Sequence, residues 1–339
     1  MLLRTGPSRS DVAPEGLRRV GEAGSRLVAR DLPDRAAERK ALVAGLLAVP
    51  ASIAPRYLYD PVGCALFGAI CELPEYYPTR TEAAIFERHR REIVAAAGTG
   101  KQLVDLGAGD CRKAAAWLSW LSPRRYVAVD VAESALAGAL GQLAVEHPSI
   151  EMVGVVTDFV AGLDLHRILA PRPATFFYPG SSIGNFLPDE AERFLRSILR
   201  HCRVAAGSGL LIGVDTRKDP RRICAAYADA AGVTAAFNRN VLNHVNRVLG
   251  TRFDPAAFDH VARYDEDLGR VEMHLEARSV QTVQVEGIAR SFEAGERIHT
   301  ENSYKYTPSQ FATMLDRAGF ERVRCWQDDA GDFAVFHAQ

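Results

Sequence analysis

Through its middle third the chain alternates short apolar runs with stretches in which apolar residues recur at helical spacing. Runs of five to seven mostly apolar residues are typical of strands buried on both faces, and the stretches between them predict amphipathic helices. Strands separated by helices indicate a parallel sheet covered on both faces, which is an α/β fold. The predicted strands are residues 102–106, 126–131, 150–156, 174–178 and 209–215, and the predicted helices are residues 113–121, 133–146 and 189–202.

The alternation stops after residue 216 and resumes at Pro308, where a helix is followed by two terminal strands. A segment of different pattern between two parts of one sheet indicates an insertion, which we place at residues 217–305. The elements predicted after residue 216 are two helices within 219–250 broken near Gly232, a helix over 253–263, strands over 269–278 and 283–292, a helix over 308–318, and strands over 321–327 and 332–337.

The first 80 residues differ from the alternating region. Residues 1–30 are rich in Arg, Gly, Ser and Ala without sustained apolar periodicity, and they predict a mobile tail. Residues 34–47 have helical spacing, and the aromatic block 57–86 has Thr79 or Thr81 in position to cap the next helix. We therefore expect a tail at 1–30, a cofactor-binding sheet domain at 81–216 plus 306–339, and a substrate-binding lobe at 31–80 plus 217–305.

The stretch QLVDLGAGDCRK, residues 102–113, joins the first predicted strand to the first helix through two glycines. Glycine lacks the Cβ atom that keeps the backbone away from a ligand, so such a turn predicts a nucleotide-like cofactor. A dinucleotide fingerprint needs a third glycine in the frame that starts at Gly107, and this chain has Arg112 there. The missing glycine, with Asp105 in the strand and Lys113 on the helix, favours S-adenosylmethionine (SAM) over NAD. A plain strand-to-helix turn is the alternative.

Polar and aromatic side chains follow the carboxyl ends of the predicted strands, where ligands of parallel sheets bind. Asp130 ends the second strand and could accept both ribose hydroxyls or cap a helix. Asp158 and Phe159 follow the third strand, where they would meet an adenine ring or serve as a cap and a core residue. Lys113 could bind the carboxylate of the cofactor or be solvated at the surface. Asn185, in the loop after the fourth strand, offers a hydrogen bond to a substrate or to its own backbone.

Composition narrows the classes of partner. The 339 residues are 47% hydrophobic and 24% charged with a formal net charge of -1, which gives no indication of a nucleic-acid or membrane partner. Six scattered cysteines without a C-x-x-C pair predict reduced thiols, and the nine histidines do not cluster at metal-ligand spacing. The longest apolar run, 41–54, is too short to span a bilayer, and the N-terminus lacks a signal-peptide core. We therefore expect a cytoplasmic protein without a metal.

Several strings of the sequence are long and unusual, and together they resemble the SAM-dependent histidine Nα-methyltransferases of ergothioneine biosynthesis. The similarity covers about residues 45–339. It implies a Rossmann-like class I methyltransferase sheet with an inserted second α+β lobe, SAM as the cofactor and L-histidine as the small-molecule substrate. The strings are YDPVG from Tyr59 with LPEYYPTRTEA from Leu73, GSSIGN from Gly180, AYADAAGVTAAFNRN from Ala226, RVEMHLEAR from Arg270 and TENSYKY from Thr300.

The resemblance implies residues for both ligands, although each residue also has a plain interpretation as a core or turn residue. Asn185 and Tyr227 would hold the α-carboxylate of the substrate, and Tyr76, Glu301 and Ser303 would hold its imidazole. We expect Met273 to line the substrate pocket or to be a strand core residue; the sequence does not separate the two. The cofactor residues that the resemblance implies are Tyr59, Gly107, Lys113, Asp130, Asp158 and Phe159.

The reaction that the resemblance implies is transfer of three methyl groups from SAM to the α-amine of L-histidine, which gives the betaine hercynine. Because the sulfonium is already an activated donor, the protein has mainly to position the reactants, and we assign no residue as a base. The alternatives are the same reaction on another aromatic amino acid such as tryptophan, a non-catalytic SAM-binding protein and a nicotinamide oxidoreductase. Loss of the Glu301 and Ser303 pair would favour tryptophan, and both residues are present. We expect a monomer.

Overall fold

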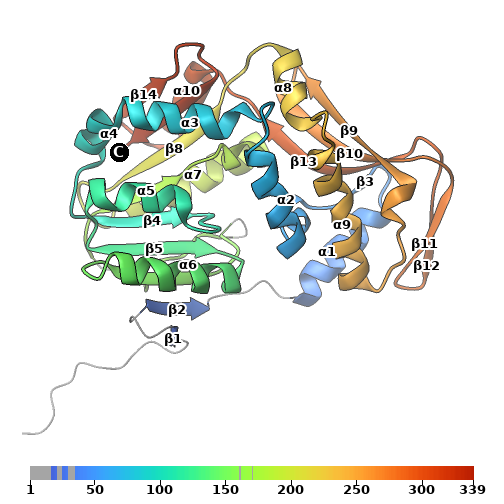
Figure 1. Cartoon of the computed structure of the whole chain (residues 1–339), viewed down its shortest axis with the longest axis horizontal. Coiled ribbons are helices and arrows are strands. Elements are labelled where there is room, and N and C mark those ends of the chain that lie inside the picture. The colour runs from blue at the N-terminus through green and yellow to red at the C-terminus, as the bar shows by residue number, and fades with distance from the viewer. Residues whose placement is uncertain (1–16, 21–24, 30–34, 160–161, 170) are drawn as a thin grey trace, which may run out of the picture.

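The structure is a computed structural model that describes residues 17–20, 25–29, 35–159, 162–169 and 171–339. Within these residues a mixed sheet of nine strands has the order β1-β2-β6-β5-β4-β7-β8-β15-β14 (Figure 1). The strands from β2 to β8 are parallel to one another, whereas β1 is antiparallel to β2, β15 to β8 and β14 to β15. The strands are Leu17–Val20 (β1), Ser25–Ala29 (β2), Gln102–Leu106 (β4), Arg125–Asp130 (β5), Glu151–Val156 (β6), Ala174–Tyr178 (β7), Gly209–Asp215 (β8), Val323–Gln327 (β14) and Phe333–Ala338 (β15).

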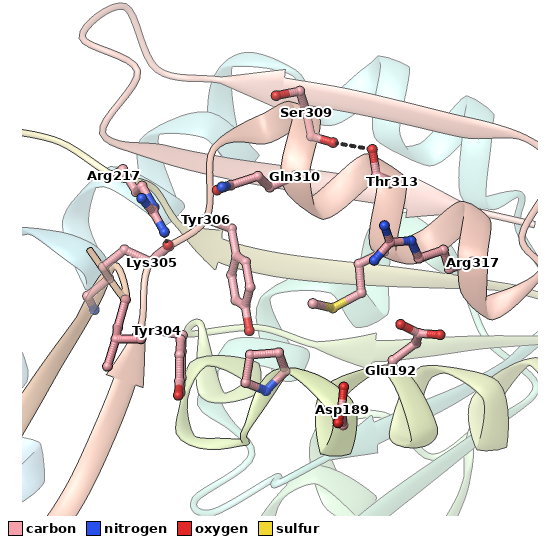
Figure 2. A pocket seen from close by; sticks show the side chains of 13 residues that line it. Asp189, Glu192, Arg217, Tyr304, Lys305, Tyr306, Ser309, Gln310, Thr313 and Arg317 are labelled. Carbon is pink, nitrogen blue, oxygen red and sulfur yellow. Dashed lines mark hydrogen bonds between the residues drawn. The ribbon is translucent and has the colours of Figure 1, made fainter. Parts of the chain in front are cut away.

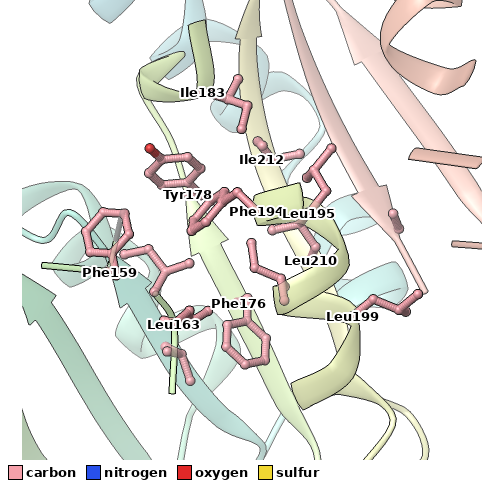
Figure 3. Packing of buried hydrophobic residues seen from close by; sticks show 14 of the residues in the cluster. Phe159, Leu163, Phe176, Tyr178, Ile183, Phe194, Leu195, Leu199, Leu210 and Ile212 are labelled. Atoms are coloured by element: carbon pink, nitrogen blue, oxygen red, sulfur yellow. The ribbon is translucent and has the colours of Figure 1, made fainter. Parts of the chain in front are cut away.

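Helices cover both faces of this sheet because strand side chains alternate between the faces and are apolar on each. Phe176 and Tyr178 of β7 pack with Phe194 on one face (Figure 3), whereas Phe177 between them packs with Phe86 on the other. This double burial confirms the prediction of a doubly covered α/β sheet. The helices on the first face are Pro188–Cys202 (α7) and Pro308–Ala318 (α10), and those on the second are Tyr77–Arg88 (α3), Arg90–Ala97 (α4), Arg112–Leu121 (α5) and Glu133–Glu146 (α6).

A second group of elements lies beside the carboxyl ends of the parallel strands and has a hydrophobic core of its own (Figure 1). It contains a four-stranded sheet in the order β3-β13-β10-β9 and a separate hairpin of β11 and β12. The strands are Ala51–Ser52 (β3), Phe258–Asp265 (β9), Arg270–Ala277 (β10), Gln281–Val285 (β11), Ile288–Phe292 (β12) and Arg297–Tyr304 (β13). The α-helices are Arg35–Leu47 (α1), Pro61–Cys71 (α2), Pro220–Tyr227 (α8) and Val233–Leu249 (α9), and the 3-10 turns are Pro55–Leu58 (η1) and Pro255–Ala257 (η3), with Ser182–Asn185 (η2) after β7.

Two predictions within the inserted segment are wrong. The helix predicted over residues 253–263 is the short η3 turn followed by β9, an edge strand that pairs with β10 alone. Because most of its side chains are partly exposed on both faces, β9 lacks the clean alternation that identifies a strand. The single strand predicted over residues 283–292 is the β11–β12 hairpin, which turns at Glu286 and Gly287, both with positive φ. The strand β13 was not predicted, because its run of polar residues has no apolar stripe.

Two predictions near the N-terminus also need correction. Ser25–Ala29, within the predicted tail, forms β2 and pairs in parallel with β6; the side chains of Leu27 and Val28 are buried. An apolar pair this short gives no periodic signal, and residues 1–16, 21–24 and 30 of the predicted tail lie outside the described residues. Neither Thr79 nor Thr81 caps a helix, because α3 begins earlier, at Tyr77. Proline at the second position of α3 presets the helical φ there, so the helix starts without a side-chain cap.

The glycines of α2 allow a test of its packing. A Cβ atom at Gly63 would lie 1.7 Å from the carbonyl oxygen of Leu58, whereas a Cβ atom at Gly68 would have no atom within 4 Å. We predict that Gly63→Ala lowers the free energy of unfolding by about 1–3 kcal/mol, because the backbone has to move. Gly68→Ala should raise it by about 0.5–1 kcal/mol through the lower entropy of the unfolded chain. Urea unfolding of both variants measures the difference, and equal stability of the two would contradict this packing.

Candidate active site

The glycine turn after β4 is open on its outer side. Gly107 and Gly109 have φ of 69° and 53°, values that residues with a Cβ atom rarely adopt, and a Cβ atom at Gly109 would have no atom within 4 Å. Cys111, which also has a positive φ, is the N-cap residue of α5. The turn therefore leaves room for a ligand against its backbone, at the carboxyl edge of the sheet.

Asp130 and Phe159 come to this turn from the ends of the next two strands. The carboxylate of Asp130 accepts hydrogen bonds from the backbone N–H of Gly109 (2.9 Å) and of Ala132 (3.0 Å). A Cβ atom at Gly107 would lie 3.7 Å from Cζ of Phe159, so this ring lies against the turn. The structure thus brings the predicted residues Gly107, Asp130 and Phe159 together. Asp130 is not a helix N-cap, because that position of α6 belongs to Ala132.

Asp158 and Lys113 each have a partner within the protein. The buried carboxylate of Asp158 accepts a hydrogen bond from Arg56 of η1 (3.2 Å). The ammonium of Lys113 pairs with the buried Glu82 of α3 (2.8 Å), whose other oxygen accepts from the backbone N–H of Gly180 (2.7 Å). Sequence reasoning missed Arg56 and Glu82, because each lies far along the chain from the residue that it contacts and no local pattern marks the pair.

Tyr59 lies among aromatic rings of the second core and not at the glycine turn. Its ring packs edge-on against Phe67 (5.7 Å between centroids) and against Phe237 (5.6 Å). The thiol of Cys64 donates to the carbonyl oxygen of Tyr59 (3.4 Å), and burial together with the nearby charge of Asp130 raises the pKa of that thiol. The start of α2 therefore lies near Asp130, and it connects Tyr59 to this residue of the predicted cofactor set.

Asn185 and Glu301 are in direct contact although 116 positions separate them. The amide of Asn185 in η2 donates to the carboxylate of Glu301 in β13 (2.7 Å). Met273 of β10 is the cross-strand partner of Glu301. Glu301 is 6% exposed and Met273 is 2% exposed, so both side chains are buried. The contact joins the loop after β7 to the inserted sheet.

Tyr227, Ser303 and Tyr76 form the second half of the predicted substrate set. The hydroxyl of Tyr227 donates to Oγ of Ser303 (2.8 Å), and the ring of Tyr227 packs edge-on against Tyr76 (6.4 Å). Phe67, which sequence reasoning missed, packs between Tyr76 (6.2 Å) and Tyr59. All of the predicted substrate residues except Asn185 are less than a tenth exposed. The structure thus gathers them into one buried cluster.

A buried ionic network, also missed from the sequence, lies under Tyr227 and Ser303. The ammonium of Lys305 donates to both hydroxyls (2.8 and 3.0 Å) and to the carboxylate of Asp215 (2.6 Å). Asp215 also accepts from Lys218 (2.5 Å) and from the hydroxyl of Tyr77 (2.9 Å). Lys305 is part of the TENSYKY string, but a lysine in a polar strand gives no sign that it is buried.

Burial changes the acidity of Glu301. Removal of the carboxyl from water raises its pKa to about 7, and the charge of Lys305 and the hydrogen bond from Asn185 oppose this rise only in part. Glu301 therefore changes its protonation state near neutral pH, where it can serve as either an acceptor or a donor.

Two cavities open elsewhere on the surface. One of about 410 Å³ lies between α7 and α10 and is lined by Arg217, Tyr306 and Gln310 among others; Figure 2 shows that the ammonium of Lys305 points away from it. The other, of about 610 Å³, is lined by Arg263, Glu272, His274 and further residues of the inserted sheet. Neither is lined by Tyr76, Tyr227 or Glu301. The residues predicted to bind the substrate thus line neither cavity, although Lys305 beneath them contributes to the wall of the first.

One group of side chains among the described residues has metal-binding atoms close together, namely Asp164, His166 and His201. Both ring nitrogens of His201 are already used: Nε2 accepts from the backbone N–H of Leu165 (3.0 Å) and Nδ1 contacts the carbonyl oxygen of Ser197 (2.9 Å). His201 would have to break one of these bonds to bind a metal, so the group reads as a structural cluster. Among the described helices, none is both long and apolar enough to cross a membrane.

Comparison with known proteins identifies the family. A sequence model of the family described as "Histidine-specific methyltransferase, SAM-dependent" matches residues 38–339. The chain belongs to this family. It is a SAM-dependent methyltransferase with a Rossmann-like class I sheet, as the resemblance implied.

Curated relatives of this SAM-dependent methyltransferase span most of its length. The histidine N-alpha-methyltransferase of Mycolicibacterium smegmatis is 42% identical over 310 residues, which is 89% of this chain and 95% of the relative. The enzyme of the same name from Mycobacterium tuberculosis is 40% identical over 305 residues, 88% and 93% of the two chains. Ergothioneine biosynthesis protein 1 of Neurospora crassa is 30% identical over 288 residues, 82% of this chain and 32% of that longer protein.

The raised pKa of Glu301 predicts a pH-dependent loss of stability. The unfolded chain releases the Glu301 proton near pH 4.5, whereas the folded protein holds it to about pH 7. Below pH 4.5 both states are protonated, and as pH rises from 4.5 to 7 ionisation favours the unfolded state. Relative to Glu301→Gln, which does not titrate, the unfolding free energy of the natural protein should fall over this range by up to about 3 kcal/mol.

Urea unfolding at several pH values between 4.5 and 8 measures this difference. Glu87→Gln, at an exposed position of α3, is the matched control and should follow the natural protein at every pH. A stability difference between the natural protein and Glu301→Gln that does not change with pH would show that Glu301 is not shifted.

Proposed function

We propose that this protein transfers three methyl groups from SAM to the α-amine of L-histidine and so makes hercynine, the first step of ergothioneine biosynthesis. The observation that carries the proposal is the family match over residues 38–339, within which Glu301 and Ser303 project into one buried cluster with Tyr227. Polar groups paired in this way suit an imidazole, which offers one N–H donor and one acceptor nitrogen.

We propose that two groups of residues bind the two ligands separately. Residues 81–216 plus 306–339 would bind SAM, and residues 31–80 plus 217–305 would bind the substrate. The separate core of the second group of elements supports the division, although α3 continues across its first boundary. We propose further that the protein works as a cytoplasmic monomer.

The cofactor would lie along the glycine turn. The open space at Gly109 supports this assignment, because a SAM molecule needs close approach to the backbone there. Asp130 would accept the ribose hydroxyls, since each of its oxygens has a further acceptor position besides its bond to a backbone N–H. Phe159 would pack on the adenine ring, and the carboxylate of Asp158 would accept a hydrogen bond from the adenine. Lys113, paired with Glu82, and Tyr59 would face the amino-acid end.

The substrate would lie between η2 and β13. Asn185 and Tyr227 would hold the α-carboxylate, while Glu301, Ser303 and Tyr76 would hold the ring, with Met273 beside it. To do so, Asn185 would exchange its present bond to Glu301 for one to the substrate. Such a site rejects ligands that leave its buried polar groups unpaired.

The chemistry requires positioning more than acid–base help. SAM supplies a methyl group already activated by the positive sulfonium. The protein holds the α-amine in line with that methyl group, and burial of the site favours the neutral amine that attacks. We assign no residue as the proton acceptor.

The proposed reaction is tested by incubating the protein with SAM and L-histidine, and in parallel with L-tryptophan, and reading product masses. We expect mono-, di- and trimethylated histidine, with the trimethylated form as the end product and little tryptophan product. Methylation of tryptophan without methylation of histidine would favour the alternative substrate. Binding of SAM without methylation of either amino acid would point to a non-catalytic SAM-binding protein.

The cofactor assignment predicts that Asp130→Ala weakens SAM binding by about 10- to 100-fold, because hydrogen bonds between a carboxylate and the ribose hydroxyls are lost. Asp110→Ala removes an exposed carboxylate of the same turn and is the matched control, for which we expect little change. Isothermal titration calorimetry with SAM measures both. Equal affinities of the two variants would remove Asp130 from the cofactor site.

A further inference from the structure

A buried ammonium group lies under two of the proposed substrate residues. Lys305 is 1% exposed, and its three N–H donors are all used, on Asp215, Tyr227 and Ser303. We propose that Lys305 is a positioning residue that makes the hydroxyls of Tyr227 and Ser303 donate toward the substrate and that attracts the substrate carboxylate. This inference rests on the proposed function.

The stability of the fold alone does not explain why the ammonium group of Lys305 is buried here. Removing an ammonium group from water is costly, and apolar residues of similar volume often replace a buried ion pair without loss of stability. Besides Asp215, Lys305 donates to Tyr227 and Ser303, two hydroxyls of the buried cluster. These two hydrogen bonds connect Lys305 to the proposed ligand site.

The network carries more positive than negative charge. Among the residues that the structure describes, Asp215 is the one carboxylate paired with Lys218 (2.5 Å) and with Lys305 (2.6 Å). The carboxyl group of Glu301, which also acts on Lys305 electrostatically, keeps its proton up to about pH 7 because burial raises its pKa. The two ammonium groups thus share one carboxylate, and the network keeps an excess of positive charge beside Tyr227 that the α-carboxylate of a bound amino acid would balance.

The hydrogen bonds of Lys305 also fix which way the two hydroxyls point. Because the oxygen of Tyr227 accepts from Lys305, its proton points elsewhere, at present toward Ser303. A hydroxyl that accepts from an ammonium is a stronger donor. A bound carboxylate can accept the hydrogen bond that Tyr227 now donates to Ser303. Ser303, which still accepts from Lys305, then donates to the unprotonated ring nitrogen while Glu301 accepts from the ring N–H.

The test compares two ligands that differ only at the carboxylate. L-Histidinol has a hydroxymethyl group in place of the carboxylate of L-histidine. Dissociation constants for both are measured by calorimetry on the natural protein, on Lys305→Met and on Lys218→Met. Lys218→Met is the matched control, because it removes the other ammonium from Asp215 without touching Tyr227. We expect Lys305→Met to reduce the preference for histidine over histidinol at least about tenfold and Lys218→Met to retain most of it.

The outcomes separate a positioning role from a structural one. If Lys305→Met weakens the binding of both ligands equally, or of neither, the proposal is wrong. Loss of a merely structural lysine would not act on the carboxylate alone and would leave the preference for histidine unchanged. Should Lys305→Met fail to fold, the double variant Lys305→Met with Asp215→Asn removes both charges of the pair and is measured in the same way; an unchanged preference there overturns the proposal. Failure of the natural protein to methylate histidine would instead overturn the proposed function, whereas methylation with an unchanged preference in Lys305→Met overturns this inference alone.

Discussion

The carboxylate of Asp215 ties the main sheet to the inserted one. It ends β8 and accepts from Tyr77 at the start of α3, from Lys218 and from Lys305 just after β13. Its backbone N–H donates to Ser181 in the loop after β7 (2.8 Å). Burial disfavours the charge, yet the two lysines hold the pKa of this carboxyl below its ordinary value. Since an unpaired carboxylate in the interior is costly, these contacts keep the end of β8, the start of α3 and the end of β13 fixed relative to one another.

A bulge in β13 determines what that strand presents to the site. Met273 pairs with Glu301 and the next residue, His274, pairs with His299, so Thr300 is an extra residue in β13. Neighbouring residues of β10 face opposite sides of the sheet, so the bulge sends Glu301 to the opposite side from His299, which lines the outer cavity. Beyond the bulge, alternation keeps Ser303 on the side of Glu301. One face of β13 is thus apolar before the bulge, where it belongs to the core, and polar after the bulge, where it faces the proposed site.

The sequence predicts those parts of the structure that have a local signal. β4, β7 and β8 lie where their apolar runs indicate, because both faces of each strand are buried. β2 and β13 give no such signal: the first has one apolar pair and the second is mostly polar. The resemblance supplied the positions of Glu301 and Ser303. Lys305 was in the same string, but its burial depends on Asp215, 90 positions earlier, and only the folded chain shows that contact.

The two proposed ligand regions share structural supports. Arg56, in the segment before α2, pairs with Asp158 at the end of β6, and α2 itself begins near Asp130. The same segment belongs to the core that holds β10 and β13. A displacement of this segment would therefore move groups at the cofactor edge together with groups around the substrate. Methyl transfer depends on alignment of donor and acceptor within a fraction of an ångström, so a support common to both proposed sites is a physical reason for this segment, which packs with the inserted lobe, to contact the sheet edge at two separate points.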